Sequence, residues 1–443
     1  MSSKTIWKEI IVYLIYCGYQ PEIFEFILSK NIKLIVILDE HFQKMVELLR
    51  EHNAKQGLPF DDMFDRIKLY RIGSFDSIEQ LQGVCVDIKV NEYPVLGVTL
   101  MDEIRQYGAG FIASQFDNFK FLPTNTVMCR DKRSMKYHLS KAGVRCAKFV
   151  SVAQIDDVQT REKAAALNYP VIVKPASGLG STSTEKADTP AQLNAFFDSY
   201  KLATHIISDH LIVEEFVDGE EYHCDVLFLN SEPVVLSIGK YNANVLTINK
   251  DENMHLGGCL LPEAEHASLY AKATTMAKQV VDVIGYQTGL VHMEFFVETG
   301  SDELVFSEVA ARLGASATEC LQRKYGPGLI GKYINILTGD DDPSYPYNRN
   351  DKKYYGYMRF EVRKQGEITK VTSAQEVLKM ESVVDCMPLR ELGNVLTMKS
   401  TSWMKVLFET DDYQSFVDCS QRVAELVEFE VDESKAPKKK DEG

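Results

Sequence analysis

Residues 291–316 constrain the possible fold more than any other part of the chain, and they read VHMEFFVETGSDELVFSEVAARLGAS. Two runs in which apolar and polar residues alternate, His292–Val297 and Leu304–Val309, flank a polar break that contains Gly300. Alternation with a period of two is typical of half-buried strands, and a glycine between two such runs is typical of a turn. The stretch therefore predicts a β-hairpin.

Two glutamates fall opposite each other in this predicted hairpin. A turn centred on Ser301 pairs Glu294 with Glu308 on one face, with Cβ atoms about 5 Å apart. Like charges so placed are destabilising unless one carboxylate is protonated or a cation lies between them, and Mg²⁺ takes carboxylate oxygens. The same parity places Arg312, an anion-binding group, just beyond Glu308. A slip of one residue would separate the pair, and an acidic, solvated face is the alternative interpretation.

Length and composition limit the class of protein. A chain of 443 residues suggests about three domains at roughly 150 residues each. Its net charge of −15 opposes attraction to nucleic acid and to anionic membranes, so we expect neither as a partner. Nine cysteines without a C-x-x-C pair favour reduced thiols. The apolar run Ile10–Cys17 is too short to span a bilayer and has no convincing cleavage site, so we expect a cytoplasmic location.

The first part of the chain alternates between strand and helix patterns. We expect strand, helix, strand, helix and strand at residues 10–16, 21–29, 33–38, 42–52 and 66–70. This β-α-β opening predicts an open parallel α/β sheet. No G-x-G-x-x-G follows the first strand, so a dinucleotide site there is poorly supported.

A polar residue follows the next apolar run. We expect Cys85–Val90 to be a strand and Val95–Tyr107 a helix, which places Glu92 at the carboxyl end of a strand. Open α/β sheets bind ligands at that edge, so Glu92 is a candidate to orient a substrate amine. A carboxylate that favours the start of a helix explains it equally well.

A lysine and a flexible loop follow one another at residues 169–184. The strand YPVIVKP ends at Lys174, and the loop ASGLGSTST follows it. Small residues let backbone N–H groups surround phosphate oxygens, and hydroxyls add donors. This is no Walker A loop, because the lysine precedes the glycines. The candidate phosphate contacts are Lys174, Ser177, Gly178, Gly180 and Ser181.

Two further segments suggest a bound nucleotide. Arg130–Arg133 opens a helix that ends near Ala142, and basic residues there oppose the helix dipole unless an anion lies near Lys132; a solvated charge cluster is the alternative. Residues 211–228 predict two strands about a turn at Asp218-Gly219. Their clustered carboxylates suit an adenine and a ribose, or else form an acidic edge that discourages aggregation.

In this order the segments resemble the ATP-grasp superfamily of carboxylate-amine ligases, over residues 10–339. The matching residues are Lys132 in CRDKRSMKYHLSKAGV, Lys174 in YPVIVKPASGLGST, Glu214 to Glu221 in VEEFVDGEEY, Glu294 in HMEFF, and Glu308 with Arg312 in SEVAARLGAS. The stretch VNEYPVL and the combination of HMEF with EVAARLGA are most similar to L-amino acid ligases, which make dipeptides.

The resemblance implies an α/β ATP-grasp fold. We expect a Rossmann-like pre-ATP-grasp domain at residues 1–125, an ATP-grasp domain at 126–350 with a lid subdomain at about 149–209, a C-terminal α+β domain at 351–431 and a flexible tail at 432–443. The lid would close its glycine-rich loop over ATP. The C-terminal domain would help to close the active site.

The resemblance also implies roles for single residues, with ATP and Mg²⁺ or Mn²⁺ as cofactors. Phosphates would contact Lys132 and Lys174; adenine would contact Glu214, Glu215, Phe216 and Val217; ribose would contact Glu221; two metal ions would bind Glu294 and Glu308; and Arg312, with Lys174, would be catalytic.

Two positions depart from the family pattern. Many members have asparagine as a further metal ligand where this chain has Ala310, which leaves the number of metal ions open. Some relatives have lysine near the adenine where this chain has Glu215, whose backbone remains able to serve.

Residues 241–262 lack clear periodicity and predict a long loop beside the substrate pocket. Lys240 and His255 are candidate substrate contacts, and so is His292, which shares the face of Glu294. For each histidine, a packed and hydrogen-bonded side chain is the alternative.

The expected reaction is the activation of an amino-acid carboxylate as an acyl phosphate, followed by attack of an amine, with release of ADP and phosphate. The alternatives are a ligase that loads a carrier thiol, a biotin carboxylase-like enzyme and a nucleotide-binding regulatory protein without turnover. The expected partners are small-molecule carboxylates and amines. The sequence identifies neither substrate, and a homodimer is the working expectation for assembly.

Overall fold

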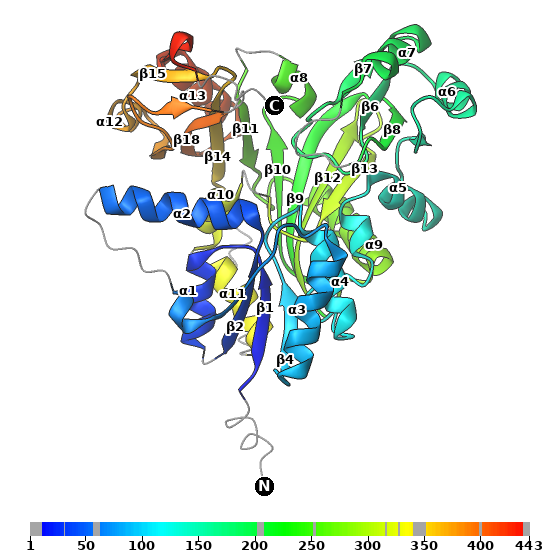
Figure 1. The fold of residues 1–443 in the computed structure, drawn as a ribbon. Coiled ribbons are helices and arrows are strands. Elements are labelled where there is room, and N and C mark those ends of the chain that lie inside the picture. The colour runs from blue at the N-terminus through cyan, green and yellow to red at the C-terminus, as the bar shows by residue number, and fades with distance from the viewer. Residues whose placement is uncertain are drawn as a thin grey trace.

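The computed structural model describes residues 11–30, 32–55, 63–201, 208–250, 254–314, 317–326, 328–339, 351–397 and 401–436. A large sheet occupies the centre of the molecule. In the view of Figure 1, the N-terminal sheet lies below it, a small sheet that forms the lid lies above and to the right, and the C-terminal unit lies above and to the left. The mixed α/β class is as the sequence predicts.

The N-terminal unit is a four-stranded parallel sheet with helices on it. The strand order is β3-β2-β1-β4, and every pairing is parallel. The strands are β1 Tyr13–Cys17, β2 Lys33–Leu38, β3 Lys68–Arg71 and β4 Val95–Thr99. The helices are α1 Pro21–Ser29, α2 Glu40–Lys55, the 3₁₀ turn η1 Phe64–Arg66, α3 Ile78–Val90 and α4 Gln106–Gln115. The predicted β-α-β opening is confirmed.

The next prediction along this unit is wrong, because helix and strand are exchanged. Residues 85–90 are the end of helix α3, and residues 95–99 are strand β4. The buried residues of α3 recur at helical spacing, at Leu81, Val84, Cys85 and Ile88. Glu92 therefore lies exposed in the turn that enters β4, at the amino end of the strand.

The lid is a four-stranded antiparallel sheet with its own small apolar core. Its strand order is β5-β8-β6-β7, made of β5 Phe149–Val152, β6 Val171–Pro175, β7 Glu185–Ala187 and β8 Leu211–Glu215. Helices α6 Val158–Ala165 and α7 Pro190–Ser199 pack on it. The predicted glycine-rich loop joins β6 to β7.

The central sheet has eight antiparallel strands in the order β13-β12-β9-β10-β11-β14-β18-β16. Their bounds are β9 Gly219–Leu229, β10 Glu232–Tyr241, β11 Leu256–Leu260, β12 Gly289–Glu298, β13 Leu304–Ala310, β14 Tyr354–Val362, β16 Val383–Pro388 and β18 Thr401–Thr410. Because β11 pairs with β14, the boundary expected at residue 350 falls within one continuous sheet.

Helices cover both faces of this sheet. One core includes α9 Ala267–Ile284, α5 Lys132–Lys141, the 3₁₀ turn η2 Thr126–Cys129 and α13 Tyr413–Leu426. The other includes α10 Thr318–Tyr325 and α11 Gly328–Thr338 together with α1, and so joins the N-terminal unit to the sheet. The small sheet β17-β15-β19 and helix α12 complete the C-terminal unit, with bounds β15 Gly366–Val371, α12 Ala374–Val377, β17 Val395–Leu396 and β19 Phe429–Asp432.

The expected tail begins too early. Residue 432 ends β19, and Glu433–Lys435 forms the 3₁₀ turn η3, whose Lys435 pairs with Glu367 at 3.0 Å. Residues 437–443, where the rest of the tail was expected, lie outside the described residues. All nine cysteines are unpaired, as expected. Within the described residues, no helix is both long enough and apolar enough to cross a membrane.

The predicted hairpin is β12 with β13, and Glu294 lies opposite Glu308. The route to that register differs from the prediction. Near the tip Phe295 pairs with Phe306, so the turn is half a residue away from the predicted centre, and a bulge at Ser307 then restores the pairing of the two glutamates.

Candidate active site

A cavity of about 980 Å³ is lined by residues of the lid, the central sheet and the N-terminal unit. Most of the candidate residues line it. These are Lys132, Lys174, Gly178, Gly180, Ser181, Glu214, Glu215, Phe216, Val217, Glu221, His292, Glu294, Glu308 and Arg312. Ser177, Lys240, His255 and Glu92 are not among the lining residues.

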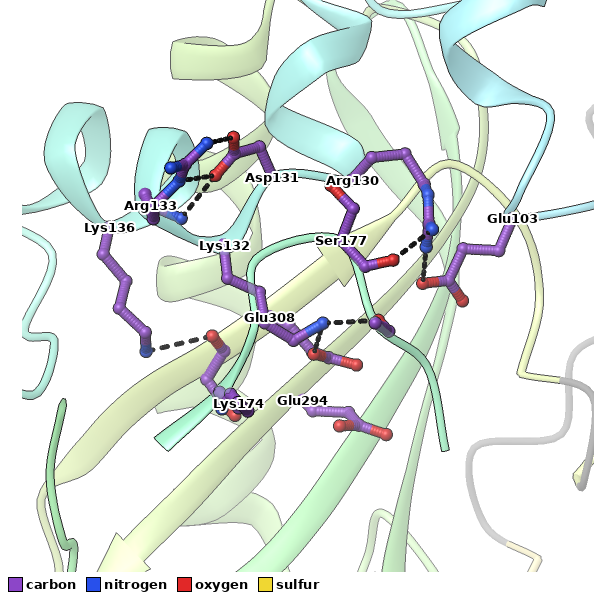
Figure 2. Close-up of polar contacts among 12 residues, drawn as sticks. Glu103, Arg130, Asp131, Lys132, Arg133, Lys136, Lys174, Ser177, Glu294 and Glu308 are labelled. Carbon is purple, nitrogen blue, oxygen red and sulfur yellow. Dashed lines mark hydrogen bonds and ion pairs between the residues drawn. The ribbon is translucent and has the colours of Figure 1, made fainter. Parts of the chain in front are cut away.

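Lys132 connects the hairpin to the glycine-rich loop. It is the first residue of α5, where the Asp131 side chain caps the helix by accepting from two backbone N–H groups. Its Nζ donates to the Gly178 carbonyl at 2.8 Å and lies 2.7 Å from Glu308 Oε2 (Figure 2). Burial raises the pKa of Glu308, but the ammonium groups of Lys132 and Lys174 outweigh it and bring the pKa to about 2. Glu308 is therefore an anion at neutral pH.

Lys174 and Lys136 share one buried carboxylate. Glu214 Oε1 lies 2.5 Å from Lys174 Nζ, and Oε2 lies 3.0 Å from Lys136 Nζ. Burial raises the pKa of Glu214, but the two ammonium groups bring it to about 2. This carboxylate is thus occupied by lysines, and the backbone of its strand is paired on both edges. An adenine contact is left to Phe216 and Val217, which follow the strand and line the cavity. Lys136, which lies one helical turn from Lys132, was not among the predicted site residues.

The neighbouring Glu215 side chain also points to the protein. Its Oε1 accepts from the Asn168 backbone N–H at 3.0 Å and from Asn168 Nδ2 at 2.8 Å. Its backbone N–H donates to the Lys148 carbonyl at 2.9 Å, so neither that group nor the side chain is left open to a nucleotide.

A buried carboxylate that the sequence analysis missed holds two arginines. Glu103 accepts from Arg130 Nη1 at 2.9 Å, and Arg130 also donates to the Ser177 carbonyl (Figure 2). Glu103 accepts from Arg312 Nη2 as well. Burial raises the pKa of Glu103, but Arg312 and the other cations bring it below its ordinary value. Glu103 follows the carboxyl end of β4, where α/β sheets place ligand contacts. A correct assignment of β4 would have found it.

The glycine-rich loop is tied to the N-terminal unit on its outer side. The Ser177 hydroxyl lies 2.9 Å from the Tyr107 hydroxyl, so it points away from the cavity that its neighbours line. Gly180 and Ser181 follow with φ of 57° and 55°, in the left-handed region that favours glycine.

Asp225 is a second missed carboxylate, and it lies beneath the hairpin. It accepts from His223 Nδ1 at 2.9 Å, from His292 Nδ1 at 3.0 Å and from the Gly314 backbone N–H at 2.6 Å. Burial lowers the pKa of His292, but Asp225 outweighs it and raises that pKa to about 10. His292 is therefore a cation, and its Nε2 lies 3.4 Å from Glu294 Oε1.

Glu221 closes the cavity toward a short helix. Its Oε2 accepts from the backbone N–H of Val245 at 2.7 Å, where helix α8 (Val245–Lys250) begins. Burial and the Glu294 carboxylate raise the pKa of Glu221 to about 8. The long loop predicted for residues 241–262 is therefore wrong in part, since it contains α8 and strand β11.

Comparison with known proteins agrees with this geometry. Residues 167–320 match the family model of the ATP-grasp domain. This chain contains an ATP-grasp domain. It is 27% identical over 278 residues to an L-arginine-specific L-amino acid ligase of Bacillus subtilis. The aligned region covers 61% of this chain and 64% of that protein. It is 30% identical over 114 residues to a D-alanine–D-alanine ligase of Clostridium perfringens, which covers 26% of this chain and 36% of that protein.

The overall fold is similar to that of an L-amino acid ligase from Bacillus licheniformis. That structure aligns with a TM-score of 0.68 at 17% identity, over 95% of this chain and 99% of the other. The predicted ATP-grasp fold is confirmed. The matches cover less than two thirds of the length of both curated relatives.

The donor set of the ATP-grasp domain fits a hard divalent cation. Glu294 and Glu308 face each other across the hairpin, and Tyr241 donates to Glu294 at 2.8 Å. Mg²⁺ and Mn²⁺ both prefer such carboxylate oxygens. Ala310 lies opposite His292 in the register, and a protonated imidazole has no lone pair to offer a metal. This pair of positions therefore adds no donor to the two carboxylates.

Three of the substrate candidates lie away from the cavity of the ATP-grasp domain. Lys240 Nζ pairs with Glu220 at 2.5 Å, because strand alternation turns Tyr241 inward instead. The His255 ring packs 4.6 Å from that of Phe360, and burial lowers its pKa. Glu92 is exposed at the amino end of β4, so the reason for proposing it is removed.

Proposed function

We propose that this chain is an ATP-dependent ligase that activates a carboxylate as an acyl phosphate and joins it to an amine. The observation that carries the proposal is the convergence, in one cavity, of opposed Glu294 and Glu308 with Lys132, Lys174 and Arg312. Carboxylates for a divalent cation beside cations for phosphate are the parts that phosphoryl transfer requires. The similarity to L-amino acid ligases makes an amino acid the proposed carboxylate and a dipeptide the proposed product.

Lys132 and Lys174 could each exchange a protein carboxylate for a phosphate oxygen when the nucleotide binds. Lys132 is paired with Glu308 and Lys174 with Glu214, so the cations are held in place before the nucleotide enters. A divalent ion held by Glu294 and Glu308 would screen the charge of the β- and γ-phosphates. Lys132 would then turn from Glu308 to phosphate while still donating to the loop carbonyl of Gly178.

The transfer itself rests on position and charge. An oxygen of the substrate carboxylate attacks the γ-phosphorus, the bond to the β-phosphate oxygen breaks, and ADP leaves. The amine then attacks the acyl carbon, phosphate leaves, and the amine loses a proton. Arg312, oriented by Glu103, would stabilise the negative charge that develops in both steps. The lid loop would exclude water that hydrolyses the acyl phosphate.

The test is ADP and phosphate release over a matrix of paired amino acids, with the product of each active pair identified by mass spectrometry. We expect release that depends on both partners and a product with a new amide bond. A thioester with a carrier protein, or release that depends on bicarbonate, would replace this proposal with another ATP-grasp reaction. No release with any pair would leave a nucleotide-binding protein without turnover.

A further inference from the structure

The far wall of the cavity comes from the C-terminal unit. Alternate residues of β14 divide between two faces: Met358 and Phe360 enter the apolar core, whereas Tyr357 and Arg359 line the cavity. Across the sheet Tyr357 pairs with Gly258, and Gly258 pairs with Tyr241. The cavity therefore extends from the hairpin to β14.

Between the two tyrosines the sheet has Gly258, and the buried Tyr357 side chain lies over it. A Cβ atom at Gly258 would lie 2.9 Å from the Tyr357 hydroxyl and 3.0 Å from the Lys240 carbonyl, so the register requires glycine. Tyr241 donates to Glu294. Tyr241 and Tyr357 thus line the cavity between the paired carboxylates and Arg359.

Arg359 is held through one nitrogen and leaves two open. Its Nε donates to the Ser402 hydroxyl and lies 3.2 Å from Glu361 Oε1. Within the described ranges, Nη1 and Nη2 have no hydrogen-bond partner, and the side chain is 37% exposed. The guanidinium is thus oriented by the protein while its outer edge is free, which suits two parallel bonds to a carboxylate.

The other cations of the described lining have protein partners already. Lys132 and Lys174 are paired with Glu308 and Glu214, and Arg312 bonds both Glu103 and the Leu313 carbonyl. Lys186 belongs to the lid and lies 3.5 Å from Asp188. These partners leave Arg359 as the lining cation best prepared for a substrate anion at the far end of the cavity.

We propose that Arg359 binds the free carboxylate of the substrate that supplies the amine, and so selects an amino acid or a short peptide over a simple amine. The inference rests on the proposed ligase function and specifies its second substrate. The amine end would lie near Glu294 and Arg312, where the acyl phosphate forms. The carboxylate end would lie at Arg359, beyond Tyr241 and Tyr357.

The test compares one acceptor in two forms, using the amino acid found active in the paired matrix as its free acid and as its carboxamide. In the wild type we expect a lower KM for the free acid. In Arg359→Gln the KM of the free acid should rise at least tenfold, while the KM of the amide and the KM of ATP change less than twofold. Arg359→Lys should recover part of the preference, because it keeps the charge without the fork.

Two control variants distinguish recognition of the substrate by Arg359 from a purely structural role of this residue. Ser402→Ala removes one of the two partners of Nε but keeps Glu361 and the guanidinium, so the preference for the acid should persist. Arg390→Gln changes an exposed arginine of the same unit that donates to the Leu389 carbonyl. If Arg359→Gln raised both KM values equally, or neither, while the wild type turned over, Arg359 would be a structural brace and the inference would be overturned. A dipeptide acceptor in the same assay shows which length of substrate depends on Arg359.

A wild type that releases no ADP with any pair would overturn the proposed function itself. That result is distinct from an active wild type whose acid preference survives Arg359→Gln. Thermal denaturation of each variant verifies that a lost preference does not come from a lost fold.

Discussion

Lys136 gives the sharpest test of the electrostatics beneath the lid. Its side chain is 1% exposed, its Nζ lies 3.0 Å from Glu214 Oε2, and it donates to the Ser307 carbonyl at 3.1 Å. Replacing it with methionine keeps the length of the side chain and removes the charge. Glu214 would then be a buried carboxylate with Lys174 as its one remaining ammonium partner.

The cost can be worked from the pKa of Glu214. That pKa falls from an ordinary 4.5 to about 2 in the folded protein, a difference worth about 3 kcal/mol. Removal of one partner from a buried pair costs about 3 to 5 kcal/mol in general. We expect Lys136→Met to lower the free energy of unfolding at pH 7 by about 3 kcal/mol.

The effect should depend on pH in a defined direction. A depressed folded pKa stabilises the protein above the ordinary pKa, and that stability is lost as the pH falls toward the folded pKa of about 2. The difference between wild type and Lys136→Met should therefore be constant above a pH of about 5 and shrink below about 4.5. Urea denaturation at a series of pH values measures it.

The matched control is Lys141→Met on the same helix, where the lysine is exposed and donates to the Tyr137 hydroxyl. An exposed contact of this kind is worth about 1 kcal/mol or less. If Lys136→Met cost no more than Lys141→Met, or if its cost did not change with pH, the assignment of Lys136 as a partner of Glu214 would be refuted.

Three further predictions address the site. Glu308→Gln should lower amino-acid-dependent ADP release at least a hundredfold with the fold retained, whereas Glu303→Gln in the exposed tip of the same hairpin should match the wild type; equal activity in the two variants would contradict the metal assignment. Chelation with EDTA should abolish ADP release, and Mg²⁺ or Mn²⁺ should restore it; undiminished release in EDTA would exclude a required cation. Asp225→Asn should destabilise the fold by about 3 kcal/mol at pH 6, with a smaller loss toward pH 10, because the pKa of His292 is raised to about 10 and its charge is lost over that range; urea denaturation measures this, and an unchanged difference at pH 10 would contradict it.

Local sequence pattern predicted much of the fold. Alternation predicted the hairpin, and parity alone placed Glu294 opposite Glu308. The parallel opening of the N-terminal unit followed from two short, fully apolar runs, which are typical of strands buried on both faces. The exchange of α3 and β4 arose because a short apolar run fits a buried strand and a buried helix equally well.

The site was harder to predict where partners come from distant segments. Glu103 accepts from Arg312, and Asp225 accepts from His292. Only folding brings these distant residues together. The bulge at Ser307 was also beyond local pattern. It lies where the Phe306 backbone N–H donates to the Arg145 carbonyl at 2.8 Å, and Lys136 donates to the carbonyl of Ser307.

Because of that bulge, the alignment of the two carboxylates does not depend on the length of the hairpin tip. Without the extra residue, Ser307 would face Glu294, and Glu308 would rotate to the opposite face. Because the bulge lies beside the site, the exposed residues 299–303 do not have to set the register of the two glutamates. The tip is therefore the place to insert a fluorescent reporter or an affinity tag, which would project from the hairpin while the paired glutamates keep their positions.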